Sequence, residues 1–229
     1  KLNLINNQQI DNINFDFEIK NKLHSFNKIK VVFEKINFSS NQIKIIKKKN
    51  NFLVEGDLNS SKSLIDVKLL SIFFSDHFND LDISNFYLSS KNKFILKSKS
   101  SPLKSFKYDG DFKFTEINVK SKIILNGLKY NFKSRSLKNY ITDYNNLIEF
   151  DNHKLDASYI NNKFSIKCQG IYSINNKKDN ISYNVEFKNG DYFINSQIDL
   201  ISNPIQVNFL NYKKVEKKNS VLDIDAVYK

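Results

Sequence analysis

The chain has little of several residue types that constrain other proteins. It contains no Met and no Trp, one Cys, two Pro and five Gly in 229 residues. The single cysteine, Cys168, excludes a disulfide within the chain, so cysteine usage does not indicate a compartment. With Gly and Pro so scarce, turns must rely on Asn, Asp, Ser and Lys. Because a complete translation product begins with Met, we expect the chain to be a piece of a longer protein.

Arginine is nearly absent, and long apolar runs are missing. The net charge is +12, yet Arg135 is the one arginine, and the lysines are spread along the chain. Nucleic-acid-binding proteins generally use Arg for bidentate contacts to guanine and phosphate. The Lys, Asn, Ile, Phe and Tyr content is typical of AT-rich coding, and we expect no nucleic-acid partner. No apolar stretch reaches the ~18 residues that a membrane-spanning helix needs.

Alternation of apolar and polar residues is the main positive signal. In residues 182–188 every second residue is apolar, and residues 222–228 largely repeat this pattern. Successive side chains of a strand point to opposite faces, so each segment offers one apolar and one polar face. This pattern is typical of an antiparallel sheet that is wet on one side. The same alternation occurs in residues 15–19, 112–114, 128–132 and 205–209.

Turn signals separate these segments at intervals of about ten residues, as in all-β domains. Asn189-Gly190 is the strongest, because both central residues of a type I′ hairpin turn need a positive φ. Residues 64–78 fit either a helix or a buried strand, and their β-branched and aromatic content favours a strand. Residues 136–147 carry the next weakest strand pattern. Further turns are predicted at Lys49-Asn50-Asn51, Asp109-Gly110, Asn126-Gly127, Asn161-Asn162 and Asn175-Asn176.

These patterns predict an all-β chain built on a long antiparallel sheet, with little or no helix. We expect residues 1–229 to form one elongated sheet segment without an internal boundary. Two segments of the chain show a weak internal similarity. Residues 51–56 and 162–170 each begin with Asn at the start of a strand and reach a Gly near its end.

The histidines and carboxylates do not form a recognisable catalytic or metal motif. None of the histidines has a ligand partner at HxH or HxxxH spacing. A polar loop accounts for the densest cluster, Asp76-His77 with Asp80 and Asp82, better than a metal or acid–base site does. The GxSxG, P-loop, GxGxxG and CxxC motifs are absent from the sequence. The three histidines are His24, His77 and His153.

Cys168 is the remaining candidate for reactive chemistry. It alternates with Phe164, Ile166 and Tyr172, which predicts a position on the apolar face of a strand. A cysteine buried in this way behaves as a small hydrophobic residue of low reactivity. We therefore expect no catalytic residue, no metal and no cofactor, and hence no enzyme activity.

Two pairs of segments resemble the AsmA-like superfamily, the bacterial relatives of the bridge-like lipid-transfer proteins. The first pair is residues 35–45 and 51–58, and the second is residues 191–200 and 203–214. A pattern of amphipathic strands separated by Asn-containing turns extends over most of the chain. The amino-terminal membrane anchor of that family has no counterpart in this sequence.

The resemblance implies a strongly curved sheet that forms a β-groove in a periplasmic protein. That protein would be anchored to the inner membrane through a segment outside this sequence, and it would serve outer-membrane biogenesis. Its concave apolar side would carry phospholipid acyl chains between the inner and outer membranes. Burial of each CH₂ group of an acyl chain would stabilise binding by about 0.8 kcal/mol. The groove-lining candidates are Phe164, Ile166, Tyr183, Val185, Phe187, Ile205, Val207, Phe209, Leu222 and Ile224.

A structural or adhesive β-sandwich of a surface or secreted protein is the alternative function. In a sandwich the same apolar faces pack on each other and leave no groove. The shape of the sheet discriminates between the two, because a closed two-layer core favours a sandwich and a single open sheet favours lipid carriage.

Overall fold

A computed structural model describes residues 2–3, 9–49, 51–67, 82–99, 114–141 and 143–228 of the chain. Strands dominate these residues, and the α-helix α3 and the 3-10 helix η3 are short. The elements, in chain order, are β1 Leu2–Asn3, β2 Gln9–Lys20, β3 Leu23–Phe33, β4 Ile36–Lys47, β5 Phe52–Ile65, β6 Phe86–Ser98, β7 Phe114–Asn126, β8 Leu128–Asn131, α3 Arg135–Tyr140, β9 Leu147–Ile160, β10 Lys163–Ile174, β11 Lys177–Lys188, β12 Asp191–Asp199, β13 Ile205–Val207, η3 Asn208–Leu210, β14 Tyr212–Lys214 and β15 Val221–Tyr228.

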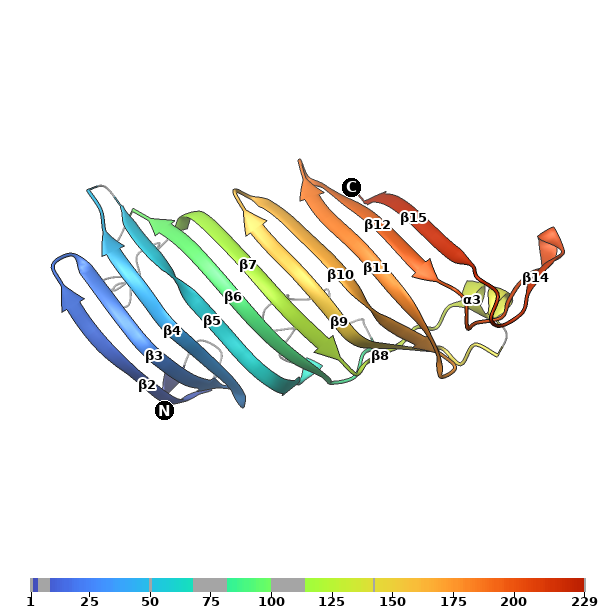
Figure 1. The fold of residues 1–229 in the computed structure, drawn as a ribbon, viewed down its shortest axis with the longest axis horizontal. Helices are drawn as coiled ribbons and strands as arrows, with labels where there is room; N and C mark the ends of the chain where they lie inside the picture. The colour runs from blue at the N-terminus through green and yellow to red at the C-terminus, as the bar shows by residue number, and fades with distance from the viewer. Residues whose placement is uncertain are drawn as a thin grey trace. The chain divides into compact units, whose positions relative to one another are not determined.

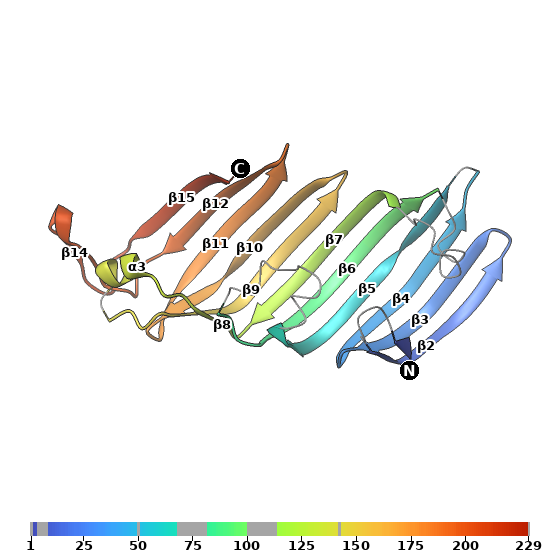
Figure 2. The same cartoon turned by 180° about the vertical axis from the view of Figure 1, so that it is seen from behind.

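The strands are hydrogen-bonded almost in the order in which they occur in the chain. A 13-stranded sheet runs from β1 through β7 to β9 and on to β12 and β15, while β8 pairs with β9 (Figures 1 and 2). The sheet is open, because β1 and β15 are the end strands of this order in the described part of the chain. Strands β13 and β14 form a separate two-stranded ribbon. The prediction of an antiparallel all-β fold with little helix is therefore confirmed.

The hairpin turns follow the predicted chemistry. At Asn161-Asn162 and at Asn175-Asn176 both residues have φ between 52° and 62°. Asn189 and Gly190 have φ of 55° and 94°, and the hairpin that they close pairs Lys188 with Asp191. These positive values are the ones that a type I′ turn requires. Asn-rich turns thus replace the Gly and Pro that the chain lacks.

The chain forms two compact units, which are described separately. Unit 1 comprises residues 1–63, 89–122 and 156–164, and unit 2 comprises residues 64–88, 123–155 and 165–229. The buried core cluster of unit 2 joins Ile141 and Tyr144, which follow α3, to Tyr172 and Ile174 of β10. The prediction of a segment without an internal boundary is not tested by this division into compact parts.

In unit 1 an irregularity in β4 explains why position 56 is occupied by glycine. The register between β4 and β5 shifts between Ser39 and Ile43. The backbone N–H groups of Asn41 and Gln42 point at the Asp57 carboxylate, with N···Oδ1 distances of 3.3 and 3.5 Å. This β-bulge brings β4 so close that a Cβ atom at Gly56 would lie 2.7 Å from the Gln42 carbonyl oxygen. A residue without a side chain is therefore needed at position 56.

Several local predictions are corrected by the structure. The strand predicted over residues 205–209 ends at Val207, because Asn208–Leu210 turns into η3. Residues 136–147 begin within a helix, α3, whose first turn is capped by the Ser134 hydroxyl accepting from the Leu137 N–H at 3.2 Å.

In the segment 64–78, β5 ends at Ile65, and residues 68–78 lie outside the described residues. The predicted turn at Asp109-Gly110 and the cluster residues Asp76, His77 and Asp80 also lie outside them.

Candidate functional site

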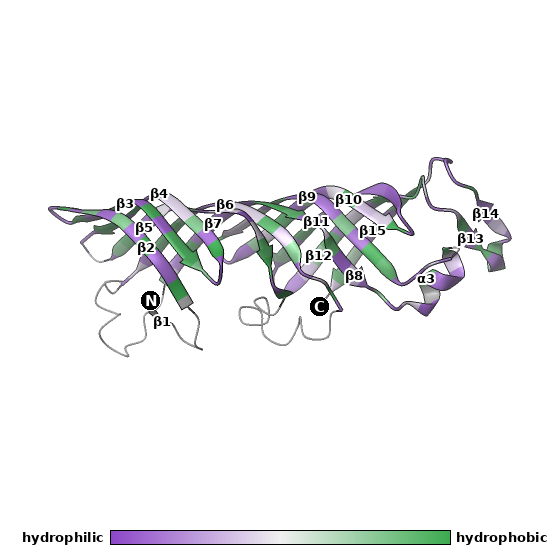
Figure 3. Cartoon of the chain, turned by 90° about the horizontal axis from the view of Figure 1, so that it is seen from below, coloured by the Kyte–Doolittle hydropathy of each residue, from purple (hydrophilic) through white to green (hydrophobic). Residues whose placement is uncertain are grey.

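In unit 2 the strand register confirms an apolar face that β11, β12 and β15 share. Residues that lie directly opposite each other in an antiparallel pair project to the same face. Val185 lies opposite Ile194, and Ile194 lies opposite Ala226. Figure 3 shows the apolar and polar residues alternating along these strands. We call this side the apolar face of unit 2. Ser196 is a polar member of it, and its apolar members on these strands are Ile181, Tyr183, Val185, Phe187, Tyr192, Ile194, Ile198, Leu222, Ile224, Ala226 and Tyr228.

Unit 1 has an apolar face of its own, which begins on β2. Phe17 lies opposite Phe26 of β3, and their ring centroids are 4.8 Å apart. Phe26 lies opposite Ile43 of β4. The apolar side chains of β2 remain strongly exposed, at 43% for Phe15, 47% for Phe17 and 57% for Ile19. Such a row of exposed apolar side chains is a candidate interaction surface.

One end of the apolar face of unit 2 is closed by the chain itself. Tyr144 and Ile141 are buried against Tyr172 and Ile174 of β10. The Tyr144 hydroxyl donates to the Phe132 carbonyl at 2.6 Å, which holds the covering segment in place. Leu137 of α3 packs against the same cluster, so α3 and the residues after it form a short lid over this end.

Seven of the ten groove candidates lie on strands of the large sheet, and three do not. Tyr183, Val185, Phe187, Leu222 and Ile224 share the apolar face of unit 2. Phe164 and Ile166 alternate with Cys168 along β10, and Phe164 belongs to unit 1. The other three candidates are placed differently from the sequence prediction. Ile205 and Val207 belong to the β13–β14 ribbon, and Phe209 belongs to η3.

A buried polar cluster on the same face of unit 2 was not predicted from the sequence. His153 and Cys168 are each 3% exposed, and the His153 Nδ1 atom lies 3.3 Å from the Cys168 Sγ atom. The His153 Nε2 atom lies 3.1 Å from the Ile171 carbonyl oxygen. A neutral imidazole protonated on Nε2 satisfies both contacts, since Nε2–H donates to the carbonyl and Nδ1 accepts from the thiol. The ring of Tyr183 lies beside that of His153, with 6.4 Å between centroids.

Burial determines the protonation states of this cluster. Burial lowers the pKa of His153, partly offset by its bond to the Ile171 carbonyl. Burial raises the pKa of the Cys168 thiol, and a hydrogen bond with Tyr183 acts in the opposite direction. Burial also raises the pKa of Tyr183. All three groups are therefore held neutral near pH 7, and a neutral buried thiol is a poor nucleophile.

Gly170 makes room for the His153 ring. A Cβ atom at position 170 would lie 2.2 Å from the Cδ2 atom of His153 and 2.4 Å from Cγ. Asn152, which precedes His153, has φ of 50° and marks an irregular point in β9. Both Gly56 and Gly170 thus lie where a Cβ atom would clash with a neighbouring strand, with the Gln42 backbone at Gly56 and with the His153 side chain at Gly170. An isolated Gly within a strand pattern is the one sequence signal that could have indicated this close approach.

We expect the stability of the protein to fall when the pH is lowered from 7 to 5. The pKa of His153 is depressed in the folded chain, so below its ordinary value of about 6.5 the unfolded chain binds more protons. The stabilisation is complete above pH 6.5 and is lost as the pH falls towards the folded pKa. One proton gives a slope of at most about 1.4 kcal/mol per pH unit. Urea titrations at each pH measure it, and His153→Leu should flatten the slope; an unchanged slope in that variant would contradict the assignment.

Each unit has a hollow on the polar side of its sheet. In unit 1 a hollow of about 510 Å³ is lined by residues that include Gln42, Lys44, Glu55 and Asp57. In unit 2 a hollow of about 370 Å³ is lined by residues that include Asn180, Ser182, Gln197 and Asp199. Asn180 donates to Asp199 at 3.0 Å across it. The importance of the apolar faces therefore rests on their exposed side chains and not on an enclosed cavity.

Within the described ranges, no group of three or more His, Cys, Asp or Glu side chains could hold a metal ion. None of the helices in the same ranges is long and apolar enough to cross a membrane. Comparisons of the chain with protein-family models, with curated proteins and with solved structures find no match.

Proposed function

We propose that this chain is a non-enzymatic segment of a lipid-transfer protein, whose apolar sheet faces carry phospholipid acyl chains. The observation that carries the proposal is the row of apolar side chains left exposed on a single-layered sheet. In unit 1, Phe15, Phe17 and Ile19 present nearly half or more of their surface to solvent. Leu222 and Ile224 of β15 are similarly exposed in unit 2. Acyl chains would cover this surface, and each CH₂ group buried in this way would stabilise binding by about 0.8 kcal/mol.

The resemblance to AsmA-like proteins supplies the setting of the proposal. In that setting the chain lies in the periplasm, is held at the inner membrane by a segment beyond this sequence, and moves phospholipid towards the outer membrane. The arrangement needs no catalytic group. It needs a sheet with one apolar and one polar side, and the register of β11, β12 and β15 provides such a sheet.

The alternative, a structural or adhesive β-sandwich, requires a second sheet that packs on the apolar face. The described residues form one large sheet and the small β13–β14 ribbon. The cluster around Tyr144 and Tyr172 is the feature that favours a closed core, and it covers one end of the face of unit 2. Lipid carriage accounts better for the exposed apolar side chains of Phe15, Phe17 and Ile19 on β2.

Native mass spectrometry of the purified chain tests the proposal. We expect phospholipid to co-purify with the protein and to be depleted several-fold by Leu222→Asp with Ile224→Asp. Each buried carboxylate would have to be desolvated against the acyl chains, which costs about 2 kcal/mol or more. Strand β15 is an end strand with exposed side chains, so the protein should still fold.

The matched control is Val221→Asp with Val227→Asp on the same strand. Val221 lies opposite Asp199 and Val227 lies opposite Phe193, so both project to the polar face. The two double variants have the same charge and differ only in the face that receives it. Equal lipid content in both variants, or a lipid-free wild-type monomer, would refute the proposal.

A further inference from the structure

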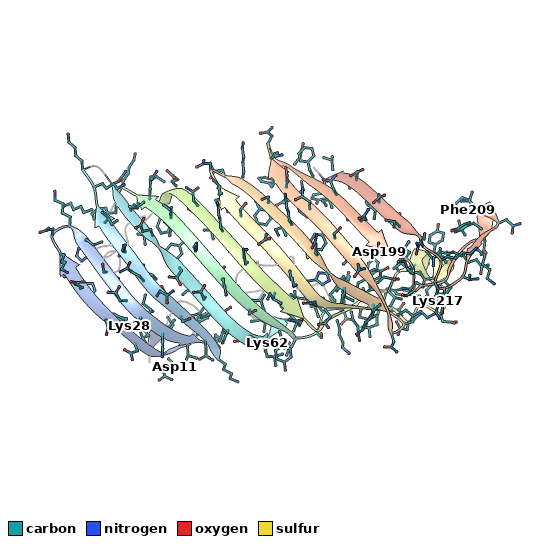
Figure 4. The ribbon with its side chains drawn as sticks, viewed as in Figure 1. Asp11, Lys28, Lys62, Asp199, Phe209 and Lys217 are labelled. Carbon is teal, nitrogen blue, oxygen red and sulfur yellow. The ribbon has the colours of Figure 1, made fainter. Side chains whose placement is uncertain are left out.

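The β13–β14 ribbon ends in an exposed apolar tip. Phe209 and Leu210 lie in η3, and their side chains are 78% and 65% exposed. No residue of η3 is buried. Figure 4 shows Phe209 at the outer end of the ribbon. Turn tips are ordinarily polar, so two apolar side chains that are this exposed at a tip indicate a partner that buries them.

The tip is held outward by a tight turn. Asn211 has φ of 50°, and its N–H donates to the Asn208 carbonyl at 3.1 Å. Asn tolerates this left-handed conformation, which reverses the chain into β14. Val207 lies opposite Tyr212 across the ribbon, so the strands on either side of the tip are paired. Phe209 and Leu210 are therefore fixed at the tip and cannot fold back without breaking these bonds.

The base of the ribbon is anchored to unit 2 by buried polar groups. Lys214 is 2% exposed, and its ammonium donates to the carbonyl oxygens of Asn203 at 2.8 Å and Ile201 at 3.2 Å. The Asp179 carboxylate accepts from the Ser202 N–H at 3.0 Å. An anchor of this kind keeps the tip in a defined position relative to β11.

The charge between the tip and the base of the ribbon indicates the chemistry of the partner that the tip binds. Lys213, Lys217 and Lys218 are exposed in the same segment. The one acidic residue between them, Glu216, forms an ion pair with Lys177. Apolar side chains at a tip with lysines behind them match the layers of an anionic bilayer, whose acyl region lies beneath negative headgroups. A stable protein interface buries about 800 Å² per partner, more than the exposed apolar side chains of this segment, Phe209, Leu210, Tyr212 and Val215, offer.

We propose that Phe209 and Leu210 insert into the surface of a membrane that contains anionic lipid, with Lys213, Lys217 and Lys218 contacting the headgroups. This site is separate from the sheet faces of the proposed function, because it determines where the chain touches a bilayer and not what the sheet carries. Phe209 was predicted from the sequence as a groove residue, and its position at the tip gives it this different role.

Flotation of the purified chain with vesicles tests the site. Wild-type protein should bind phosphatidylcholine vesicles that contain phosphatidylglycerol, and Phe209→Ser with Leu210→Ser should weaken the binding by at least about tenfold. Replacing Lys213, Lys217 and Lys218 by Gln should weaken it by at least about tenfold and reduce its salt dependence. The matched control is Phe193→Ser with Ile124→Ser, which removes two similarly apolar, exposed side chains elsewhere in unit 2 and should leave binding unchanged.

Fluorescence gives a second readout, because the chain contains no Trp. Phe209→Trp should show a blue shift on adding the anionic vesicles, and Phe193→Trp should not. Absence of vesicle binding by the wild type, or equal binding by the tip variant, would overturn the proposal. Oligomers that dissociate in the tip variant, without vesicle binding, would overturn it in favour of self-association. Lipid content by mass spectrometry should be the same in the tip variant and the wild type, which separates this test from that of the sheet.

Discussion

Replacing Gly170 by alanine is expected to lower the free energy of unfolding by about 3 kcal/mol. The new Cβ atom would lie 2.2–2.6 Å from three atoms of the His153 ring. The ring cannot move away cheaply, because its nitrogens contact the Cys168 thiol and the Ile171 carbonyl. Moving it would leave buried polar groups without partners. A loss of this size changes the ratio of folded to unfolded protein by roughly a hundredfold, and urea denaturation measures it.

A double-variant cycle distinguishes this clash from a general intolerance of side chains in β10. In a His153→Ala background the imidazole is gone, so Gly170→Ala should cost less than about 1 kcal/mol. If the cost were the same in both backgrounds, the ring would not be the reason for the glycine.

Replacing Asp179 by alanine is expected to destabilise the protein by about 2–4 kcal/mol. Its two carboxylate oxygens accept from the Ser202 N–H at 3.0 Å, and one accepts from the Asn203 amide at 3.3 Å. Asn203 is 1% exposed, so its amide would have no water to replace the lost bond. The Asp179 charge also opposes the effect of burial, which lowers the pKa of Lys214. The variant would therefore remove the larger of the two negative charges that favour the buried Lys214 ammonium and leave only that of Glu216.

The exposed Asp223 provides the control for this prediction. Its carboxylate accepts from the Gln197 amide at 3.1 Å on the surface, and Asp223→Ala should cost less than about 1 kcal/mol. In a Lys214→Met background the cost of Asp179→Ala should shrink, since the buried charge is then absent. Equal losses for Asp179→Ala and Asp223→Ala would show that the buried network contributes little. Thermal and urea unfolding of the four variants provide the measurements.

Local chemistry accounts for the elements that could be predicted from the sequence. The Asn189-Gly190 turn depends on two residues that accept positive φ, and the strands on either side of it show their own alternation. Such features are properties of a few neighbouring residues. The turn at Glu34 and Lys35 also has positive φ at both positions, yet neither residue type favours it. There the pairing of β3 with β4 imposes the conformation, and residue types alone do not indicate it.

Alternation predicted a strand without specifying its sheet. Residues 183–187 and 205–209 show the same pattern, but only the first lies in the large sheet. Asn208–Leu210 forms a turn of 3-10 helix, and this turn sends Phe209 into solvent instead of towards an apolar face. Whether an alternating segment pairs with the long strands of the large sheet depends on the rest of the chain. The local pattern does not contain that information.

The sequence by itself determined that the chain is a strand-rich, antiparallel protein with one apolar side to its strands, because alternation and Asn turns act over a few residues. The tertiary structure alone decided which strands are neighbours and what the apolar side meets. It brought His153 next to Cys168 across β9 and β10, covered one end of the face of unit 2 with α3, and left β2 and β15 exposed. These outcomes depend on register and bulges between distant segments, where a shift of one residue exchanges the two faces.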